Sequence, residues 1–185
     1  MKFCSQCGAT LNIDIPVGDN RPRHICSNPD CQEIHYVNPK IIVCTLPVLD
    51  DKVLLCKRAI EPRVGFWTLP GGFMECAEST EQGAIRETQE EAGAEVSVRQ
   101  LYRVFDMPHI NQVYIIYLAE MTSPQFEAGE ESLEVALFSE SDVPWSDVAF
   151  TVMKRALEDY FQDLKNGHFP IKNALIKKSQ LMYIT

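Results

Sequence analysis

The stretch Gly72–Ala94 reads GFMECAESTEQGAIRETQEEAGA, and its pattern predicts a loop that leads into an amphipathic helix. Ser79, followed three residues later by Gln82, matches the capping box of a helix start. Gly93 fits the left-handed position that follows a helix end. We therefore predict a helix over residues 79–92.

Three glutamates share one side of this predicted helix. At 3.6 residues per turn, Glu87, Glu90 and Glu91 fall within an arc of about 100°. A neighbouring arc suits packing against a sheet and holds Ala84, Ile85, Thr88 and Ala92. Carboxylates about 6 Å apart repel by roughly 3 kcal/mol at an effective dielectric of ~20, so a cation should offset them. Several hard oxygen ligands without sulfur favour Mg²⁺ or Mn²⁺.

Two further features of the stretch bear on this metal hypothesis. Arg86 is its only positive side chain and could orient Glu78 or Glu90 through charge-assisted hydrogen bonds. Gly71 and Gly72 allow the backbone to approach a ligand, and a carbonyl released there could join the carboxylates on a cation. The alternative is that the charges form an ordinary solvated helix face.

The cysteines are concentrated near the N-terminus. Four of the seven form a C-x2-C pair and a C-x4-C pair separated by 18 residues: Cys4, Cys7, Cys26 and Cys31. These spacings predict a zinc ribbon in which four thiolates close a structural site. His24 and His35 are rival ligands, and two disulfides or unrelated thiols are the alternative. Of the remaining cysteines (Cys44, Cys56 and Cys76), the first two lie in apolar runs and fit core packing.

After Asn38-Pro39 the sequence changes to an alternation that is typical of strands. Strands are predicted over residues 41–48, 53–59, 66–69, 94–106, 112–121 and 133–138, and a second amphipathic helix over about 146–165. Strands interleaved with two helices indicate an α/β fold with a mixed sheet covered by helices. Residues after 167 give no clear signal. The predicted organisation is a zinc ribbon over 1–37, an α/β domain over 38–166 and a C-terminal tail over 167–185.

The composition limits the possible functions. The 185 residues contain 17 Lys plus Arg and 26 Asp plus Glu, which gives a formal charge of -9. This charge argues against broad nucleic-acid binding but permits phosphate substrates when a divalent cation lies between the partners. The longest apolar stretch, Ile41–Leu49, is too short for a membrane span. We expect a soluble cytoplasmic protein with no membrane or nucleic-acid partner.

The central stretch matches a known motif. The glycine and charged positions of the Nudix box, G-x5-E-x7-R-E-U-x-E-E-x-G-U, are all filled, by Gly72, Glu78, Arg86, Glu87, Glu90, Glu91 and Gly93. The apolar U positions hold Thr88 and Ala94, and Trp67–Gly72 is similar to the segment that leads into the box. The chain thus resembles a Nudix hydrolase. The resemblance implies a Nudix α/β/α sandwich and metal-dependent attack by water on a nucleoside diphosphate linked to another group.

Residue roles follow from the resemblance by position. Glu87, Glu90 and Glu91 would bind the catalytic metal, with the Gly72 carbonyl as a further ligand. The supporting pair that orients them would be Arg86 and Glu78. The general base would be a box glutamate or one from a later loop, where Glu131 and Glu134 are available. That loop could equally be a solvated acidic turn.

The order of ribbon and Nudix domain narrows the resemblance. NADH pyrophosphatases share this order and carry the signature S-Q-P-W-P-F-P-Q-S after the box, but Val104–Gln112 keeps a single proline of it. The chain looks more similar to plant-chloroplast-type pyrophosphatases that cleave FAD to FMN and AMP, or ADP-ribose to AMP and ribose 5-phosphate. The resemblance also implies a homodimer.

Several side chains are candidate substrate contacts under this hypothesis. Lys57, Arg58 and Arg63 could bind phosphate, although Arg58 could also be a structural cation. Ring-stacking candidates are Phe105, His109 and Tyr114, which could equally be core residues. Alternative functions are NADH hydrolysis, removal of an NAD cap from RNA, or a non-catalytic nucleotide-sensing regulator.

Overall fold

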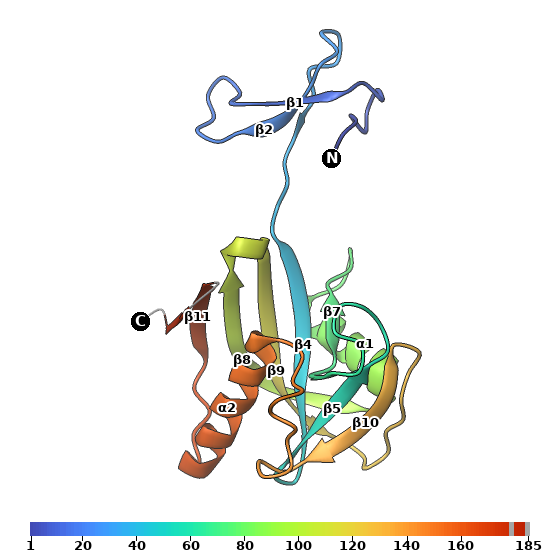
Figure 1. The fold of residues 1–185 in the computed structure, drawn as a ribbon, viewed down its shortest axis with the longest axis vertical. Coiled ribbons are helices and arrows are strands. Elements are labelled where there is room, and N and C mark those ends of the chain that lie inside the picture. The colour runs from blue at the N-terminus through green and yellow to red at the C-terminus, as the bar shows by residue number, and fades with distance from the viewer. Residues whose placement is uncertain (178–179, 184–185) are drawn as a thin grey trace. The chain divides into compact units, whose positions relative to one another are not determined.

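The N-terminal part of the chain forms a small antiparallel sheet. The computed structural model describes residues 1–177 and 180–183, and the chain divides into two units, Met1–Pro39 and Lys40–Thr185. The first unit contains β1 (Leu11–Asp14), β2 (Arg23–Cys26) and β3 (Ile34–His35), hydrogen-bonded in the order β1-β2-β3 (Figure 1). Its short strands bring the two cysteine pairs together.

The second unit is built on a mixed sheet. The described residues contribute nine strands to it: β4 (Lys40–Leu49), β5 (Lys52–Arg58), β6 (Trp67–Thr68), β7 (Gly71–Phe73), β8 (Val96–Met107), β9 (Gln112–Met121), β10 (Ser132–Phe138), β11 (Lys172–Lys177) and β12 (Gln180–Tyr183). Their order is β10-β5-β4-β9-β8-β11-β12, with β6 paired to β5 and β7 to β4. Two pairs, β4–β9 and β8–β11, are parallel and the others antiparallel.

Helices cover both faces of this sheet. Side chains alternate between the faces of a strand. On β5, Val53 and Leu55 therefore join the large core that includes α2 (Thr151–Asn166). Leu54 and Cys56 point the other way, into a smaller core that includes the end of α1 (Thr80–Ala92). Figure 1 shows the two helices on opposite sides of the sheet. The predicted α/β/α sandwich is confirmed.

The first helix begins and ends where its sequence predicts. Ser79 accepts a hydrogen bond from the Gln82 backbone and the Gln82 side chain accepts one from the Ser79 backbone, while Gly93 closes the helix with φ 57°. Thr88, which replaces an apolar residue of the box, donates to the Ala84 carbonyl at 2.7 Å and lies 2.6 Å from the hydroxyl of Thr45 on β4. The hydroxyl of Thr88, which stands where the motif has an apolar residue, is thus hydrogen-bonded inside the core.

Two predictions about the C-terminal region were wrong in detail. Helix α2 begins at Thr151 rather than near 146, because Asp147 and Ala149 exchange backbone hydrogen bonds with Trp67. The segment interpreted as a tail without signal forms β11 and β12, and β11 pairs in parallel with β8. Within the described part of the chain, no helix is long and apolar enough to span a membrane.

A buried ionic network joins β8 to α2. Arg103 is fully buried and donates to Asp159 at 2.9 Å and to Asp163 at 2.6 Å. The Tyr102 hydroxyl donates to the same Asp163 carboxylate at 2.7 Å. Because buried charges require partners, this network ties the helix to the sheet at a fixed register.

Candidate active site

The backbone of β7 brings two glycines against neighbouring side chains. A Cβ on Gly71 would collide with the Sγ of Cys44 and the backbone of β4, so only glycine fits there. A Cβ on Gly72 would lie 2.6 Å from the carboxylate atoms of Glu87. The β7 backbone therefore lies directly against the acidic side of α1.

Arg86 connects the loop before α1 to the acidic residues of the helix. Its guanidinium donates two hydrogen bonds to Glu78, at 2.9 and 3.0 Å. Its Nη1 also donates to Glu87 at 2.8 Å and to Glu90 at 2.9 Å. These bonds hold the pKa of Glu78 at about 2, with help from the Glu75 backbone N–H. Arg86 thus positions carboxylates from two turns of the helix and from the preceding loop.

Two of the carboxylates are partly removed from water. Glu91 is 6% exposed and accepts a hydrogen bond from the Gly71 N–H at 3.1 Å. Burial raises its pKa to about 7, with the Gly71 hydrogen bond opposing the rise and the neighbouring charge of Glu87 adding to it. Burial also raises the pKa of Glu87, against the lowering effect of Arg86. The contacts with Arg86 and Gly71 do not offset the burial of these two carboxylates, so a bound cation would favour their charged forms.

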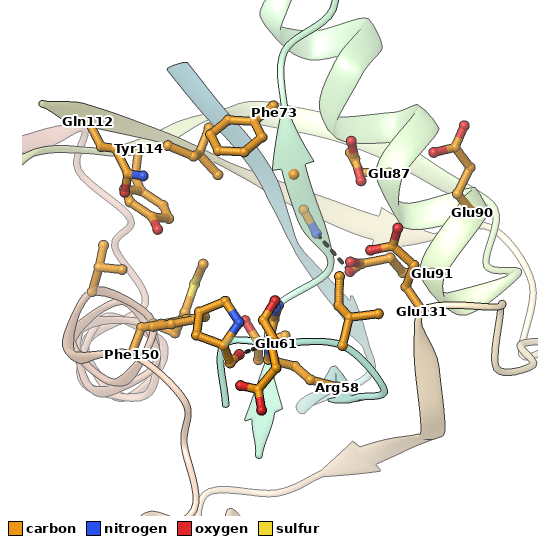
Figure 2. A pocket seen from close by; sticks show the side chains of 18 of the residues that line it. Arg58, Glu61, Phe73, Glu87, Glu90, Glu91, Gln112, Tyr114, Glu131 and Phe150 are labelled. Atoms are coloured by element: carbon orange, nitrogen blue, oxygen red, sulfur yellow. Dashed lines mark hydrogen bonds between the residues drawn. The ribbon is translucent and has the colours of Figure 1, made fainter. Parts of the chain in front are cut away.

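These carboxylates form one wall of a cavity of about 890 Å³. Figure 2 shows Glu87, Glu90, Glu91 and Glu131 on one side and Gln112, Tyr114 and Phe150 on the other. The cavity is also lined by Ile42, Met107 and Met153 from the sheet and α2. An acidic wall thus faces a largely aromatic and apolar one.

The loop between β9 and β10 completes the acidic wall. Its backbone follows the C-terminal end of α1, where the Glu127 N–H donates to the Ala92 carbonyl at 2.9 Å and the Gly129 N–H donates to the Glu91 carbonyl at 3.1 Å. A Cβ on Gly129 would collide with the Glu90 carbonyl. This close approach places Glu130 and Glu131 at the cavity.

The structure brings some of the predicted site residues together and leaves others apart. The cavity is lined by Gly72, Arg86, Glu87, Glu90, Glu91, Glu131, Arg58 and Tyr114. Glu78 reaches it through Arg86. Arg58 donates to the Pro62 carbonyl at 2.8 Å and lies 5.3 Å from the Phe150 ring centre, so it is held as a structural cation.

Five candidates lie outside this cavity. Glu134 and Lys57 pair with each other at 3.3 Å across β10 and β5. Arg63 lies over the ring of Phe66. Phe105 is fully buried in the main core and His109 is exposed on a 3-10 turn, Pro108–Ile110. Phe105 shares a sheet face with its cross-strand partner Tyr114 but is fully covered by the main core, and alternation does not show which of the two reaches the cavity.

Gln112, Phe73 and Phe150 line the cavity and were missed. Gln112 could have been found, because it lies two residues before Tyr114 on one strand and so shares its face. Phe73 and Phe150 depend on how distant segments fold together, and no local pattern marks them.

In the N-terminal unit the four predicted cysteines converge. Their Sγ atoms all lie within 4.8 Å of one another, and among the described residues no His, Asp or Glu joins the group. His35 instead lies 3.3 Å from the Cys4 Sγ. The Ala9 backbone N–H lowers the pKa of Cys7, to about 7, which favours the thiolate. All seven cysteines are free in this structure.

Comparison with known proteins gives the same assignment. Residues 2–37 match the Nudix N-terminal zinc-ribbon family and residues 38–160 match the NUDIX domain family. The protein therefore belongs to the Nudix hydrolases, as its sequence predicts.

Two curated proteins and one solved structure are among those similar to this chain. The chain is 31% identical over 138 residues to the ADP-ribose pyrophosphatase of Methanocaldococcus jannaschii, covering 71% of this chain and 78% of that protein. It is 26% identical to the NAD-capped RNA hydrolase NudC of Vibrio atlanticus, covering 90% of this chain and 60% of that protein's length. A NUDIX hydrolase structure from Nitrosomonas europaea has a TM-score of 0.92 and 50% identity, covering 96% of this chain and all of that one.

Proposed function

We propose that the protein hydrolyses the diphosphate linkage of a nucleoside diphosphate derivative, with FAD or ADP-ribose as the preferred substrate. The observation that carries this proposal is the charge of the cavity. Seven carboxylates line it: Glu61, Glu75, Glu87, Glu90, Glu91, Glu130 and Glu131. Its two arginines, Arg58 and Arg86, are already held by protein partners. An anionic diphosphate therefore requires divalent cations to bind there.

The donor set fits Mg²⁺ or Mn²⁺. Glu87, Glu90 and Glu91 offer carboxylate oxygens only, and the Gly72 backbone passes directly beside Glu87. Burial raises the pKa of Glu87 and Glu91, so a cation bound beside them would favour their charged forms. When bound, divalent cations neutralise the diphosphate oxygens and lower the pKa of the attacking water.

The protein side chains have separate tasks in this proposal. Arg86 and Glu78 fix the orientation of the ligand carboxylates. Glu131, which lines the cavity, is the proposed general base. It accepts the proton of the water whose oxygen forms the new bond to phosphorus, while the bridging P–O bond breaks and the leaving phosphate keeps the electron pair. Glu134 is the weaker candidate because it pairs with Lys57 outside the cavity.

Matched substitutions test these roles. Glu91→Gln should lower kcat at least about a hundredfold with Mg²⁺, because a ligand charge is lost. Glu131→Gln should lower kcat by roughly a hundredfold, whereas Glu134→Gln should leave it within about threefold. Unchanged turnover in Glu91→Gln would refute the proposed metal site. Equal effects of the Glu131 and Glu134 variants would refute the assignment of the base.

A substrate panel tests the proposed specificity. FAD, ADP-ribose, NADH and NAD-capped RNA are compared by kcat/KM with Mg²⁺, and the products are identified by mass. Similarity to the archaeal ADP-ribose pyrophosphatase and the formal charge of -9 support a small nucleotide over RNA. A clear preference for NADH or capped RNA would overturn the proposal and favour the NudC-like alternative.

For the N-terminal unit we propose one structural zinc ion held by Cys4, Cys7, Cys26 and Cys31. Four converging sulfur ligands leave no open position for a substrate. Elemental analysis should find close to one zinc per chain. A folded N-terminal unit free of zinc would contradict this proposal. The homodimer remains a prediction, which light scattering in solution would test.

A further inference from the structure

The wall opposite the carboxylates has the composition of a ring-binding recess. Figure 2 shows Tyr114, Phe150 and Gln112 across the cavity from the carboxylates, and Ile42, Met107 and Met153 also line the cavity. Of the two arginines that line the cavity, Arg86 is paired with carboxylates and Arg58 donates to the Pro62 carbonyl beside the Phe150 ring. An apolar and aromatic surface favours an uncharged, flat group over a further phosphate.

Two polar groups on this wall have no partner. Tyr114 is only 9% exposed, yet its hydroxyl makes no hydrogen bond with any of the residues that the structure describes, and the amide of Gln112 makes none either. The Tyr114 hydroxyl is open to the cavity, since Ser132 Oγ is the one buried side-chain oxygen or nitrogen left without a partner among the described residues. A ligand in the cavity can therefore bond to it in place of water. Burial raises the pKa of Tyr114 to about 12, so the hydroxyl stays protonated and can donate or accept.

The third feature of this wall is the aromatic ring of Phe150, which the protein holds in place. Phe150 lies at the start of α2, outside its first turn. The Arg58 guanidinium lies 5.3 Å from the centre of this ring and donates to the Pro62 carbonyl. A ring fixed in advance loses little entropy when another ring packs against it.

We infer that this recess binds a planar, uncharged heterocyclic ring of the substrate, with Phe150 packing against the ring and the Tyr114 hydroxyl and Gln112 amide determining specificity at its polar edge. An amide offers a donor and an acceptor side by side, which matches the adjacent acceptor and donor of adenine. The ring is therefore the adenine of the AMP half, and a flavin ring is the competing source. The inference rests on the proposed function, because a nucleotide must occupy the site.

Binding measurements test it without catalysis. AMP, FMN and ribose 5-phosphate, none of which contains a diphosphate linkage to hydrolyse, are titrated calorimetrically against the full chain with Mg²⁺ present. Tyr114→Phe and Gln112→Leu should each weaken AMP binding roughly tenfold, the usual effect of losing one hydrogen bond at a desolvated site. Binding of ribose 5-phosphate, which has no heterocyclic base, should not change.

A matched control keeps the test specific. Tyr117 lies on the same strand, but its hydroxyl is bonded to Thr80 at 2.6 Å and it does not line the cavity. Tyr117→Phe should leave AMP binding within about twofold. In turnover, the Tyr114 and Gln112 variants should raise KM while kcat stays within about threefold, because neither group reaches the reacting phosphorus.

The results distinguish an adenine site, a flavin site and a cavity that binds neither ring. Weaker binding of AMP supports the recess and assigns it to adenine, and selectively weaker binding of FMN supports the recess and assigns it to flavin. Unchanged binding of both overturns the inference. A wild-type protein that binds AMP in this manner but hydrolyses no dinucleotide would refute the proposed function and leave the recess standing.

Discussion

Gly72→Ala should abolish most of the activity without unfolding the protein. A Cβ at this position would lie 2.6 Å from Cδ, Oε1 and Oε2 of Glu87. Since carbon and oxygen atoms pack at about 3.5 Å, the carboxylate must move by roughly 0.9 Å. Displacements of about 1 Å in a catalytic constellation cost on the order of a hundredfold in rate. We expect kcat to fall by about that factor.

Gly72→Ala should affect the stability of the protein much less than its activity. The atoms displaced by Gly72→Ala belong to the far end of a flexible side chain, and Gly72 is not in the left-handed region. The free energy of unfolding should therefore change by less than about 1 kcal/mol. Gly71→Ala is the contrasting variant, because its Cβ would collide with Cys44 and the backbone of Val43. It should destabilise by several times as much, on the order of 3 kcal/mol.

A double-mutant cycle shows whether Glu87 carries the effect. If Gly72→Ala acts by displacing this carboxylate, adding Glu87→Gln should lower kcat little beyond the larger single effect. Steady-state kinetics over a range of Mg²⁺ concentrations and urea denaturation provide the measurements. Fully additive losses in kcat, or a Gly72→Ala protein with normal turnover, would refute the reasoning.

Three further predictions concern the fold. Arg103→Met removes the buried cation shared by Asp159 and Asp163, which keep their contacts to Arg155, Lys172 and Tyr102, and should lower the free energy of unfolding by about 3 kcal/mol in urea. Arg99→Met at the exposed pair with Glu120 should cost at most about 1 kcal/mol; similar losses would contradict this. Thr88→Val removes the hydrogen-bond partner of the buried Thr45 hydroxyl, whereas Thr45→Val leaves the Thr88 bond to Ala84 intact. Thr88→Val should therefore lower the free energy of unfolding more than Thr45→Val does, and the reverse order would contradict this prediction. Chelation of zinc should unfold the N-terminal unit, seen as loss of its amide dispersion by NMR, while the signals of the Nudix domain persist.

Local sequence patterns predicted the parts of the structure that depend on local physics. The caps of α1 are set by Ser79, Gln82 and Gly93 themselves, so the predicted ends agree with the structure. The end of β4 and the start of β5 likewise follow from the turn between them. In contrast, α2 begins later than its amphipathic pattern indicates, because a β6 residue, Trp67, takes the hydrogen bonds of the preceding backbone.

The two walls of the candidate site likewise differ in how far the sequence predicts them. The acidic wall lies mostly on one helix, where spacing fixes which residues share a side, and the motif names its residues directly. The opposite wall is assembled from β9, β7 and the start of α2, and β9 carries both the predicted Tyr114 and the missed Gln112. No spacing rule connects Phe150 with Tyr114 across 36 positions of the chain. The cause is tertiary contact, which sequence periodicity does not encode.

The two walls of the cavity contact different parts of a substrate in the proposed function. The acidic wall can serve any diphosphate, because cations and carboxylates contact only the phosphate oxygens. If the recess binds the base of the substrate as we infer, discrimination between substrates depends on the opposite wall, where Gln112, Tyr114 and Phe150 come from segments outside the motif. Two Nudix proteins with identical boxes can thus act on different nucleotides, and substitutions on this wall should change KM ratios among substrates while substitutions in the box lower kcat for all of them.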